Sequence, residues 1–342
     1  MRGRAVVVVV LLLAACGQVS GVHRAPRVEP ASPVATRASV APVPSETPSP
    51  ARNPFRPAGP KPKHSQTKTP HASTTPGLSA YRGLGTWIDV YSQANVFGPG
   101  AFGHARAIVH DMVAHGVRTL FLQAGSYRHP AVTFPAATAR IIDAAHAAGL
   151  KVVGWYLPLF RNVRYDLHEV LKTIRFRTRD GQGYDGFALD IEADLVSPAR
   201  RIANFLKLSA EIRRAVGPSY SLGAIIPSPR GLIRVPSYWP GFPYTQLSRY
   251  YDVVLPMSYF TFHYHGAGVT YRYIRDNIEI IRRATGDPAI PIHVIGGISD
   301  DMSLAETKAF VRAIETEHAY GASLYEFPGT SNEEWRVLAA LR

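Results

Sequence analysis

The sequence contains very little cysteine. Cys16 is the only one in 342 residues, so no disulfide can form within the chain. The chain also lacks a G-x-S-x-G motif, which is typical of hydrolases with a serine nucleophile. No glycine-rich phosphate-binding loop follows the first predicted strand. These absences argue against thiol and serine nucleophiles and against a dinucleotide-binding domain.

Long hydrophobic runs are also scarce. The N-terminal run, residues 5–13, is too short to span a bilayer, and Arg2 and Arg4 precede it. The four residues Leu-Ala-Ala-Cys that end at Cys16 resemble the lipobox of bacterial lipoproteins. The resemblance implies that residues 1–16 are a lipoprotein signal peptide, that Cys16 is lipidated, and that the protein is exported and lipid-anchored to the outer face of the cytoplasmic membrane or the cell envelope. An ordinary cleaved signal with an incidental cysteine is the alternative.

Residues 17–79 contain few large apolar side chains. They hold 13 of the 28 prolines, together with many serine, threonine and alanine residues. A segment of this composition cannot bury enough apolar surface to offset the entropy of ordering, so we predict a disordered linker. It carries eight Lys or Arg and two Asp or Glu, which suits an anionic envelope surface. Basic and aromatic residues are not interleaved as in single-strand binders, so we expect no nucleic-acid partner.

Residues 80–342 alternate between short β-branched or aromatic runs and amphipathic helical stretches. The predicted strands are 85–91, 118–124, 151–157, 185–192, 220–226, 252–259, 291–297 and 321–327, and the predicted helices are 102–116, 136–149, 165–178, 198–215, 269–285, 303–319 and 332–341. After the fifth strand, residues 227–249 contain only a short helical piece. Eight such repeats predict a single (β/α)8 TIM barrel, an α/β fold in which chemistry gathers where the strands end.

The fourth predicted strand carries two carboxylates. Its sequence DGFALDIE places Phe, Leu and Ile on one face, which must pack against the helices, and Ala188, Asp190 and Glu192 on the other, toward the barrel interior. Two like charges in a region of low dielectric constant separate their pKa values, so that one carboxyl keeps its proton at neutral pH. A general acid requires this. In the alternative interpretation, both carboxylates are structural and pair with arginines or cap the following helix.

Two motifs resemble the chitinase-type glycoside hydrolases of family 18. The residues that match the family signature DGxDxDxE are Asp185, Gly186, Asp190 and Glu192. The tetrapeptide Pro-Met-Ser-Tyr that ends at Tyr259 is similar to the family's PMSYD. The resemblance implies that Glu192 donates the proton, that Asp190 orients the acetamido group of the substrate, and that Tyr259 holds the acetamido oxygen while it acts as internal nucleophile. As a whole, residues 80–342 resemble a bacterial family of glycoside-hydrolase-like barrels.

The chain departs from the family pattern at three places. Ala188 stands where the first carboxylate of the inner DxDxE belongs, and Phe260 replaces the aspartate of PMSYD. Strand eight lacks the family's inward tryptophan, and alternation is expected to place Ala322, Leu324 and Glu326 together on the inward face. The loss of two carboxylates implies a weakened substrate-assisted mechanism.

A second mechanism uses two protein carboxylates on either side of the scissile bond. Glu192 is then the acid, with Glu326 or Asp89 as base or nucleophile. The candidate catalytic residues are therefore Glu192, Asp190, Tyr259 and Glu326.

The ends of other strands and the aromatic loop after strand six supply candidates for sugar binding, because aromatic rings suit the apolar faces of sugars. These candidates are Asp89, Tyr91, Gln123, Tyr156, Phe262 and His263. For Asp89 and the aromatic loop, local packing is an equal alternative. His263 and His265 form an HxH pair without a third ligand at helical spacing, so we expect no metal and no cofactor.

These features together predict a glycosidase that hydrolyses or remodels an envelope or extracellular polysaccharide. We expect a carbohydrate polymer as its partner, and we expect the protein to be a monomer. In the alternative, the protein has the same barrel but no catalytic activity, and is a carbohydrate-binding or cell-wall-associated pseudoenzyme. Ala188, Phe260 and the missing terminal tryptophan favour this alternative.

Overall fold

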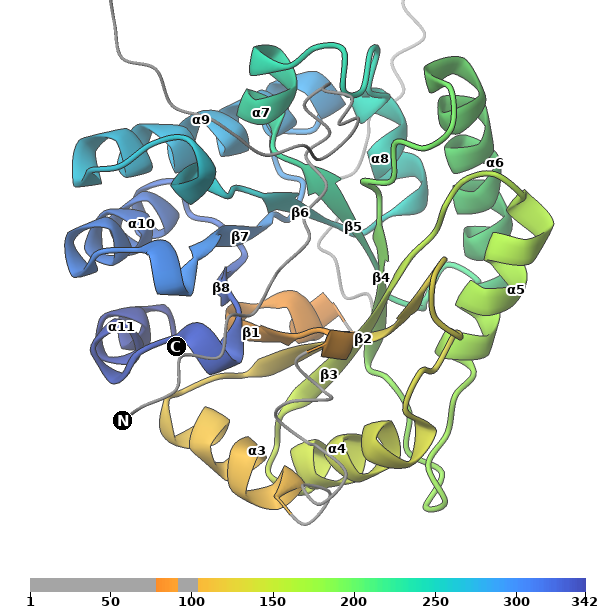
Figure 1. Ribbon diagram of the computed structural model, residues 1–342, viewed down its shortest axis with the longest axis horizontal. Coiled ribbons are helices and arrows are strands. Elements are labelled where there is room, and N and C mark those ends of the chain that lie inside the picture. Colours follow the sequence, from red (N-terminus) through yellow and green to blue (C-terminus); the bar gives the residue numbers. More distant parts are fainter. Residues whose placement is uncertain (1–77, 92–103) are drawn as a thin grey trace, which may run out of the picture. The chain divides into compact units, whose positions relative to one another are not determined.

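The computed structural model describes residues 78–91 and 104–342. The predicted signal peptide, the lipidation of Cys16 and nearly all of the predicted linker lie outside the described residues. Within them, eight parallel strands close into a barrel in chain order, and helices surround it (Figure 1). The predicted (β/α)8 architecture is confirmed.

All eight predicted strands are present, with ends shifted by a few residues. They are β1 (Gly83–Ile88), β2 (Thr119–Ser126), β3 (Lys151–Leu157), β4 (Gly186–Asp190), β5 (Leu222–Pro227), β6 (Val253–Met257), β7 (His293–Ile298) and β8 (Gly321–Tyr325). Because β4 ends at Asp190, Glu192 lies in the loop that follows it and not on the strand itself.

The helices of the described residues follow the strands as the periodicity predicts. They are α3 (Ala105–Ala114), α4 (Pro135–Ala147), α5 (Val163–Ile174), α6 (Pro198–Val216), α7 (Pro229–Arg234), α8 (Tyr244–Tyr250), α9 (Ala267–Thr285), α10 (Leu304–Thr316) and α11 (Asn332–Leu338), with short 3-10 helices that include η1 (Leu78–Tyr81) and η2 (Phe260–Phe262). The segment after β5 forms two helices, α7 and α8, where the sequence predicted one short piece. No helix in the described ranges combines the length and the apolar character that a membrane span requires.

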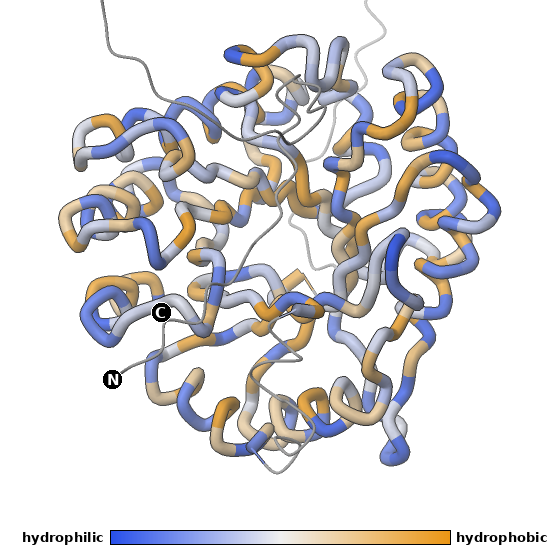
Figure 2. The backbone as a smooth tube through the Cα atoms, in the orientation of Figure 1, coloured by the Kyte–Doolittle hydropathy of each residue, from blue (hydrophilic) through white to orange (hydrophobic). Residues whose placement is uncertain are grey.

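The alternation of side chains along the strands produces two apolar layers. One layer fills the barrel and the other lies between the strands and the helices, whose turns alternate between hydrophobic and polar (Figure 2). The interior layer includes Trp87, Phe121, Trp155, Ala188, Leu255 and Tyr325. The interior is therefore a packed core, and only the ends of the strands leave room for a site.

The N-terminal end of the barrel is closed by η1. The hydroxyl of Tyr81 donates to the carbonyl of Phe187 at 2.8 Å, and the Tyr81 carbonyl bonds the Nδ1 of His293 at 2.9 Å. The hydrogen bonds continue into the barrel interior. His293 Nε2 lies 3.0 Å from the hydroxyl of Ser323, and this hydroxyl accepts from the indole of Trp87 at 2.7 Å. Burial lowers the pKa of His293 to about 4, so this ring is neutral. The site must therefore lie at the opposite, C-terminal end.

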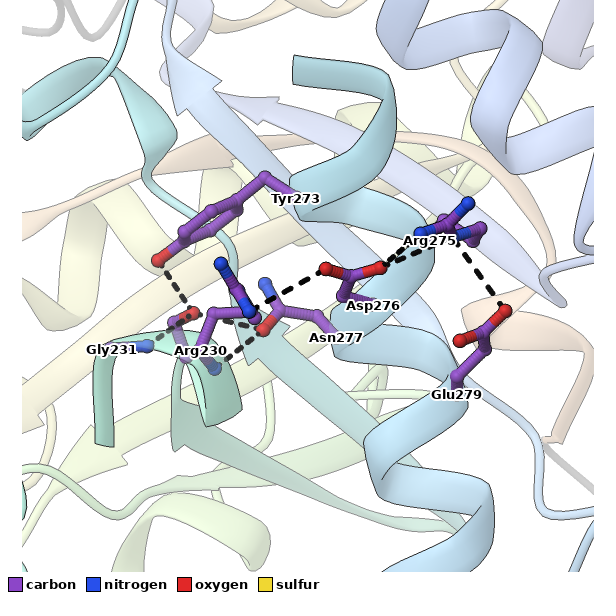
Figure 3. A network of polar contacts seen from close by, with 8 residues as sticks. Arg230, Gly231, Tyr273, Arg275, Asp276, Asn277 and Glu279 are labelled. Carbon is purple, nitrogen blue, oxygen red and sulfur yellow. Dashed lines mark hydrogen bonds and ion pairs between the residues drawn. The ribbon is translucent and has the colours of Figure 1, made fainter. Parts of the chain in front are cut away.

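A buried polar network holds the end of β5 and the start of α7 against α9 (Figure 3), and its Asn277 also bonds the residue that follows β6. Asn277 on α9 donates to the hydroxyl of Ser258 at 2.9 Å and accepts from the backbone of Arg230 at 2.8 Å and from the hydroxyl of Ser228 at 3.1 Å. Tyr273 bonds the same Ser228 hydroxyl at 2.7 Å. Because Asn277 and Ser258 are fully buried, the network fixes the backbone where β6 leaves the barrel.

Asp185 ties the start of β4 to its neighbours. Its carboxylate accepts from Val152 N at 2.8 Å and from Lys151 Nζ at 2.9 Å, and it lies 2.9 Å from His146 Nε2. Burial raises the pKa of Asp185, but these hydrogen bonds outweigh burial and the net pKa is lowered. The hydrogen bond to Asp185 raises the pKa of His146. Although Asp185 matches the family signature, it lies before β4 begins and supports the fold.

We expect the contact between His146 and Asp185 to stabilise the fold most at mildly acidic pH. The folded-state pKa of His146 lies above its ordinary value of 6.5, so its stabilisation is complete below that value and is lost as the pH rises through the folded-state pKa. The substitution His146→Gln should lower the free energy of unfolding by about 0.5–1 kcal/mol at about pH 5.5 and by less at about pH 8.5.

Urea unfolding at both pH values measures this difference. His110→Gln, at an exposed position of α3, is the matched control. An equal loss of stability at the two pH values would contradict the predicted role of the pair.

Candidate active site

The candidate site begins where β4 ends. Ala188 packs in the barrel interior, whereas Phe187 and Leu189 pack in the layer beneath the helices, as the alternation predicts. Asp190 stands at the last position of the strand and is 5% exposed, and Glu192 is half-buried two residues later. Both carboxylates therefore lie at the C-terminal end of the barrel, Asp190 on the strand and Glu192 in the loop after it, and Ala188 lies beneath them.

The surroundings of the two carboxylates favour their protonated forms. Burial raises the pKa of Asp190 well above its usual range, and the charge of Glu192 raises it further. Burial also raises the pKa of Glu192 to about 7, with a smaller contribution from Asp194. Within residues 78–91 and 104–342, no arginine or lysine forms an ion pair with Asp190 or Glu192. Pairing with arginines is therefore not their role there, and Glu192 can hold a proton near neutral pH.

Tyr259, two residues after the end of β6, lies among the acidic groups. Burial raises the pKa of its phenol well above the usual range, and the carboxylates of Glu192, Asp190, Glu326 and Asp89 add to this effect in that order. The strand ends of β1, β4, β6 and β8 thus converge on one phenol. The structure brings the four predicted catalytic residues, together with Asp89, into one region.

Tyr325 forms a second phenol at the site. Its hydroxyl donates to Oδ2 of Asp89 at 2.7 Å, and its ring centre lies 5.9 Å from that of Tyr259. The Trp87 ring lies beneath, 6.4 Å from the Tyr325 ring. Asp89 and Tyr325 are 4% and 9% exposed, so this hydrogen bond is formed in a place of low dielectric constant.

The predicted orientation of strand eight was wrong. Ala322 and Leu324 pack toward the helices, whereas Ser323 and Tyr325 face the barrel interior. The inward aromatic residue that ends β8 is therefore Tyr325, in the region where the family has tryptophan. Glu326 follows the strand, is 8% exposed and lies close enough to Tyr325 to raise the pKa of its phenol. Alternation alone could not decide between the two faces of GASLYEF, because alanine, serine and leucine fit either.

The prediction that Tyr156 binds substrate is also contradicted. Tyr156 is fully buried in the layer beneath the helices, and burial, followed by Asp166 on α5, raises the pKa of its phenol. Its neighbour Trp155 takes the inward position on β3 and packs edge-to-face against Trp87 at 5.8 Å. Tyr156 therefore cannot reach a ligand at the mouth.

Gln123 and Tyr91 lie beside Asp89 but differ in exposure. Gln123 is 5% exposed, and its amide oxygen accepts from the backbone of Val90 at 2.9 Å, which fixes the chain directly after Asp89. Tyr91 is 55% exposed and contacts the ring of His129 at 5.6 Å. Gln123 thus supports the site from within, and Tyr91 stands at its outer edge.

The aromatic loop after β6 divides into a buried and an exposed part. Phe260 is fully buried, so an aspartate at its position would enter the core and not the site. Phe262 is 37% exposed and meets Tyr259 edge-to-face at 5.7 Å. His263 is exposed, and burial followed by the charge of Arg234 lowers its pKa. Phe262 and His263 therefore offer rings to a ligand above Tyr259.

Two residues that position Glu192 were not predicted. The hydroxyl of Tyr238 donates to the carbonyl of Glu192, and Arg201 on α6 donates to the carbonyls of Tyr238 and Ala193. The guanidinium of Arg201 lies 4.0 Å above the ring of Trp239. The only signal in the sequence is the density of aromatic residues in 237–244, and nothing along the chain connects this segment to Glu192.

The described part of the chain offers no metal centre. No group of three or more His, Cys, Asp or Glu side chains there has an arrangement that could hold an ion. Of the HxH pair, His265 lies 3.7 Å from Glu306, which caps the start of α10.

No known family model and no curated protein matches this sequence. Solved structures do share its fold. An endo-1,4-β-mannanase from Rhizomucor miehei has a TM-score of 0.58 and 10% identity, over 76% of this chain and 93% of its own. A family 18 chitinase from Cycas revoluta has a TM-score of 0.54 and 11% identity, over 76% and 99%.

A third similar structure is the spore cortex-lytic enzyme SleL of Bacillus cereus. Its TM-score is 0.54 at 10% identity, over 75% of this chain and 73% of its own. All three are barrels of glycoside hydrolase type. At identities this low, the similarity shows a shared glycoside-hydrolase-like fold and nothing of the substrate.

We expect removal of the half-buried Glu192 charge to stabilise the protein. Its folded-state pKa of about 7 exceeds its ordinary value of 4.5, so folding becomes less favourable as the pH rises between these values. At about pH 8 the substitution Glu192→Gln should raise the free energy of unfolding by about 1 kcal/mol, and at about pH 4.5 the gain should disappear.

Urea unfolding across this pH range tests the expectation. Glu315→Gln, at an exposed position of α10, removes the same charge without relief of burial. A Glu192→Gln protein with the pH dependence of the wild type would show that Glu192 is ionised and solvated in the folded state.

Proposed function

We propose that the chain is a glycoside hydrolase that cleaves a polysaccharide of the cell envelope or the extracellular space, with Glu192 as general acid. The observation that carries the proposal is the position of Glu192: a half-buried carboxyl at the C-terminal end of the barrel, with a pKa of about 7 and Asp190 and Tyr259 close by. An acid works best when its pKa lies near the working pH, because it is then protonated and still able to release its proton.

The neighbouring groups suit either of two mechanisms. In a substrate-assisted reaction, Asp190 orients an acetamido group and Tyr259 holds its oxygen. Burial raises the pKa of Asp190, which favours the protonated form that can donate a hydrogen bond. In a two-carboxylate reaction, Glu326 or Asp89 acts opposite Glu192 as base or nucleophile. Asp89 accepts a hydrogen bond from Tyr325, which holds its carboxylate beside the end of β8 that precedes Glu326.

The similar structures support a carbohydrate ligand. They are described as a mannanase, a chitinase and a spore cortex-lytic enzyme. The lipobox-like sequence at Cys16 supports a lipid-anchored, exported protein, which would place the barrel near envelope polymers. We therefore propose mannan, chitin and peptidoglycan as the first polymers to test.

A second function is favoured by one observation. Ala188 lies in the packed interior beneath Asp190, so no carboxylate supports Asp190 from below, and one oxygen of Asp190 has no hydrogen-bond partner in the described part of the chain. A barrel in this state could bind glycan without cleaving it. This carbohydrate-binding pseudoenzyme is the alternative that the following experiment separates from the hydrolase.

Wild-type protein is expected to release new reducing ends from at least one of the three polymers. Loss of the proton donor in Glu192→Gln should lower the rate by about 10²–10⁴-fold, because general acid catalysis contributes about this much. The rate should fall as the pH rises above the pKa of Glu192, since the acid is then ionised. A reducing-sugar assay at several pH values measures both effects.

Glu315→Gln is again the matched control and should keep wild-type activity. If no polymer yields reducing ends and both the wild type and Glu192→Gln bind glycan equally, the protein is the pseudoenzyme. Equal hydrolysis by wild type and Glu192→Gln would remove Glu192 from the mechanism.

A further inference from the structure

Residues of α7, α8 and α9 line an apolar groove that is separate from the candidate active site. Its volume is about 380 Å³, and its lining includes Leu232, Ile233, Pro236, Trp239, Phe242 and Ile280. In the described part of the chain, no charged side chain and no side-chain amide lines this groove. A sugar needs hydrogen-bond partners for its hydroxyl groups, so the groove suits an apolar ligand and not a glycan.

Two aliphatic side chains beside the groove are exposed to solvent. Ile233 on α7 is 62% exposed, the highest value among the large apolar side chains of the described residues. Val235 follows α7 directly and is 44% exposed. A single exposed aliphatic residue is ordinary, but these two adjoin an apolar groove. The groove, Ile233 and Val235 together form the surface that is called the α7 surface below.

The segments that form the α7 surface carry the net charge of the barrel. Residues 228–251 and α9 contain seven arginines and two carboxylates. Residues 80–342 carry 28 Lys or Arg against 23 Asp or Glu, so the remainder of the barrel has 21 residues of each sign and no net charge. The α7 surface is therefore complementary to an anionic partner.

Two of these arginines, Arg230 and Arg234, lie on α7 on either side of Ile233 in the sequence, and both are exposed. Arg230 lies 3.6 Å from Asp276, a carboxylate that also pairs with Arg275 (Figure 3). The ion pairs of the described residues include none for Arg234. Its charge lowers the pKa of His263, which agrees with an uncompensated cation there.

We propose that the α7 surface docks on an anionic phospholipid membrane. Ile233 and Val235 enter the boundary between head groups and acyl chains, the end of an acyl chain lies in the groove beside Trp239, and Arg230 and Arg234 contact the lipid phosphates. Apolar burial and the attraction of basic residues to anionic lipids add in contacts of this kind.

The lipobox-like sequence at Cys16 supports the choice of a membrane as the partner, because a lipid-anchored chain stays beside a bilayer. The proposed contact belongs to the barrel itself. It does not depend on the predicted anchor or on the proposed hydrolase activity.

Co-sedimentation of the purified full chain with vesicles of equal parts phosphatidylcholine and phosphatidylglycerol tests the proposal. Val235→Asn should lower the affinity about fivefold, because it removes apolar surface from the contact. Val113→Asn is the matched control: Val113 is 38% exposed on α3, which lies across the barrel from α7 and α9 (Figure 1), and its affinity should equal that of the wild type. Equal urea-unfolding midpoints verify that both variants are folded.

The substitution Arg234→Gln separates the electrostatic part of the contact. It should lower the affinity for the anionic vesicles about fivefold and leave the affinity for pure phosphatidylcholine unchanged, because one basic residue near an anionic surface contributes about this much. Arg106→Gln, at an exposed position of α3, is the control. Equal binding of the wild type to neutral and anionic vesicles would overturn the role of the arginines.

Vesicles with brominated acyl chains locate the contact, because bromine quenches the fluorescence of nearby indoles only. Of the four tryptophans, Trp239 lines the groove, whereas Trp87 and Trp155 lie in the barrel interior and Trp335 is buried on α11. We expect quenching in the wild type and in Val113→Asn, and less quenching in Val235→Asn. Vesicle binding without quenching would show that basic residues outside the barrel bind the vesicles, and would overturn the proposal.

Two further outcomes would also overturn it. One is equal vesicle binding by Val235→Asn and Val113→Asn. The other is a wild-type dimer that Val235→Asn dissociates while vesicle binding stays unchanged, because the α7 surface would then be an interface between two copies of the chain.

Discussion

The two-residue repeat of β4 is the constraint on which the site depends. Phe187, Leu189 and Ile191 must bury their side chains beneath the helices, so Ala188 and Asp190 are forced into the barrel. A carboxylate in that place loses most of its hydration, and its protonated form is favoured. Glu192, in the loop just beyond, lies in the same region of low dielectric constant. The raised pKa values of both residues therefore follow from the packing of apolar neighbours and from the absence of a cationic partner among the described residues.

The backbone at the candidate site is held by hydrogen bonds from residues that surround it. Arg201 and Tyr238 fix the backbone of Glu192, and Asn277 fixes Ser258 directly before Tyr259. These contacts join the loop after β4 to Tyr238 and α6, and the end of β6 to α9, so they limit the movement of the backbone that carries Glu192 and Tyr259. Arg201 is a cation among these residues, and its guanidinium donates to the backbone carbonyls of Ala193 and Tyr238.

The three departures from the chitinase-type pattern lie in different parts of the barrel, and only some of them affect the candidate site. Phe260 is part of the core, so its difference from aspartate concerns packing. Tyr325 occupies the inward end of β8, so an aromatic group is present there and is tied to Asp89 by a hydrogen bond. Ala188 differs from the pattern in a way that affects the site, because it lies directly beneath Asp190 and offers no hydrogen-bonding group to that carboxyl. Of the three departures, only Ala188 thus changes the surroundings of the two carboxyls at the candidate site.

The sequence by itself determined the barrel, the order of its strands and the inward position of Asp190, because period-two and helical patterns are local and the apolar face of β4 must pack beneath the helices. It could not decide the faces of GASLYEF, where small residues fit either side, nor the burial of Tyr156, whose inward place is taken by Trp155. Only the tertiary structure brought Asp89, Tyr259, Tyr325 and Glu326 together, because their distances depend on how strands far apart in the chain close into a ring. The same reason explains Arg201 and Tyr238, whose contacts with the β4 loop arise from packing between distant segments and leave no pattern along the chain.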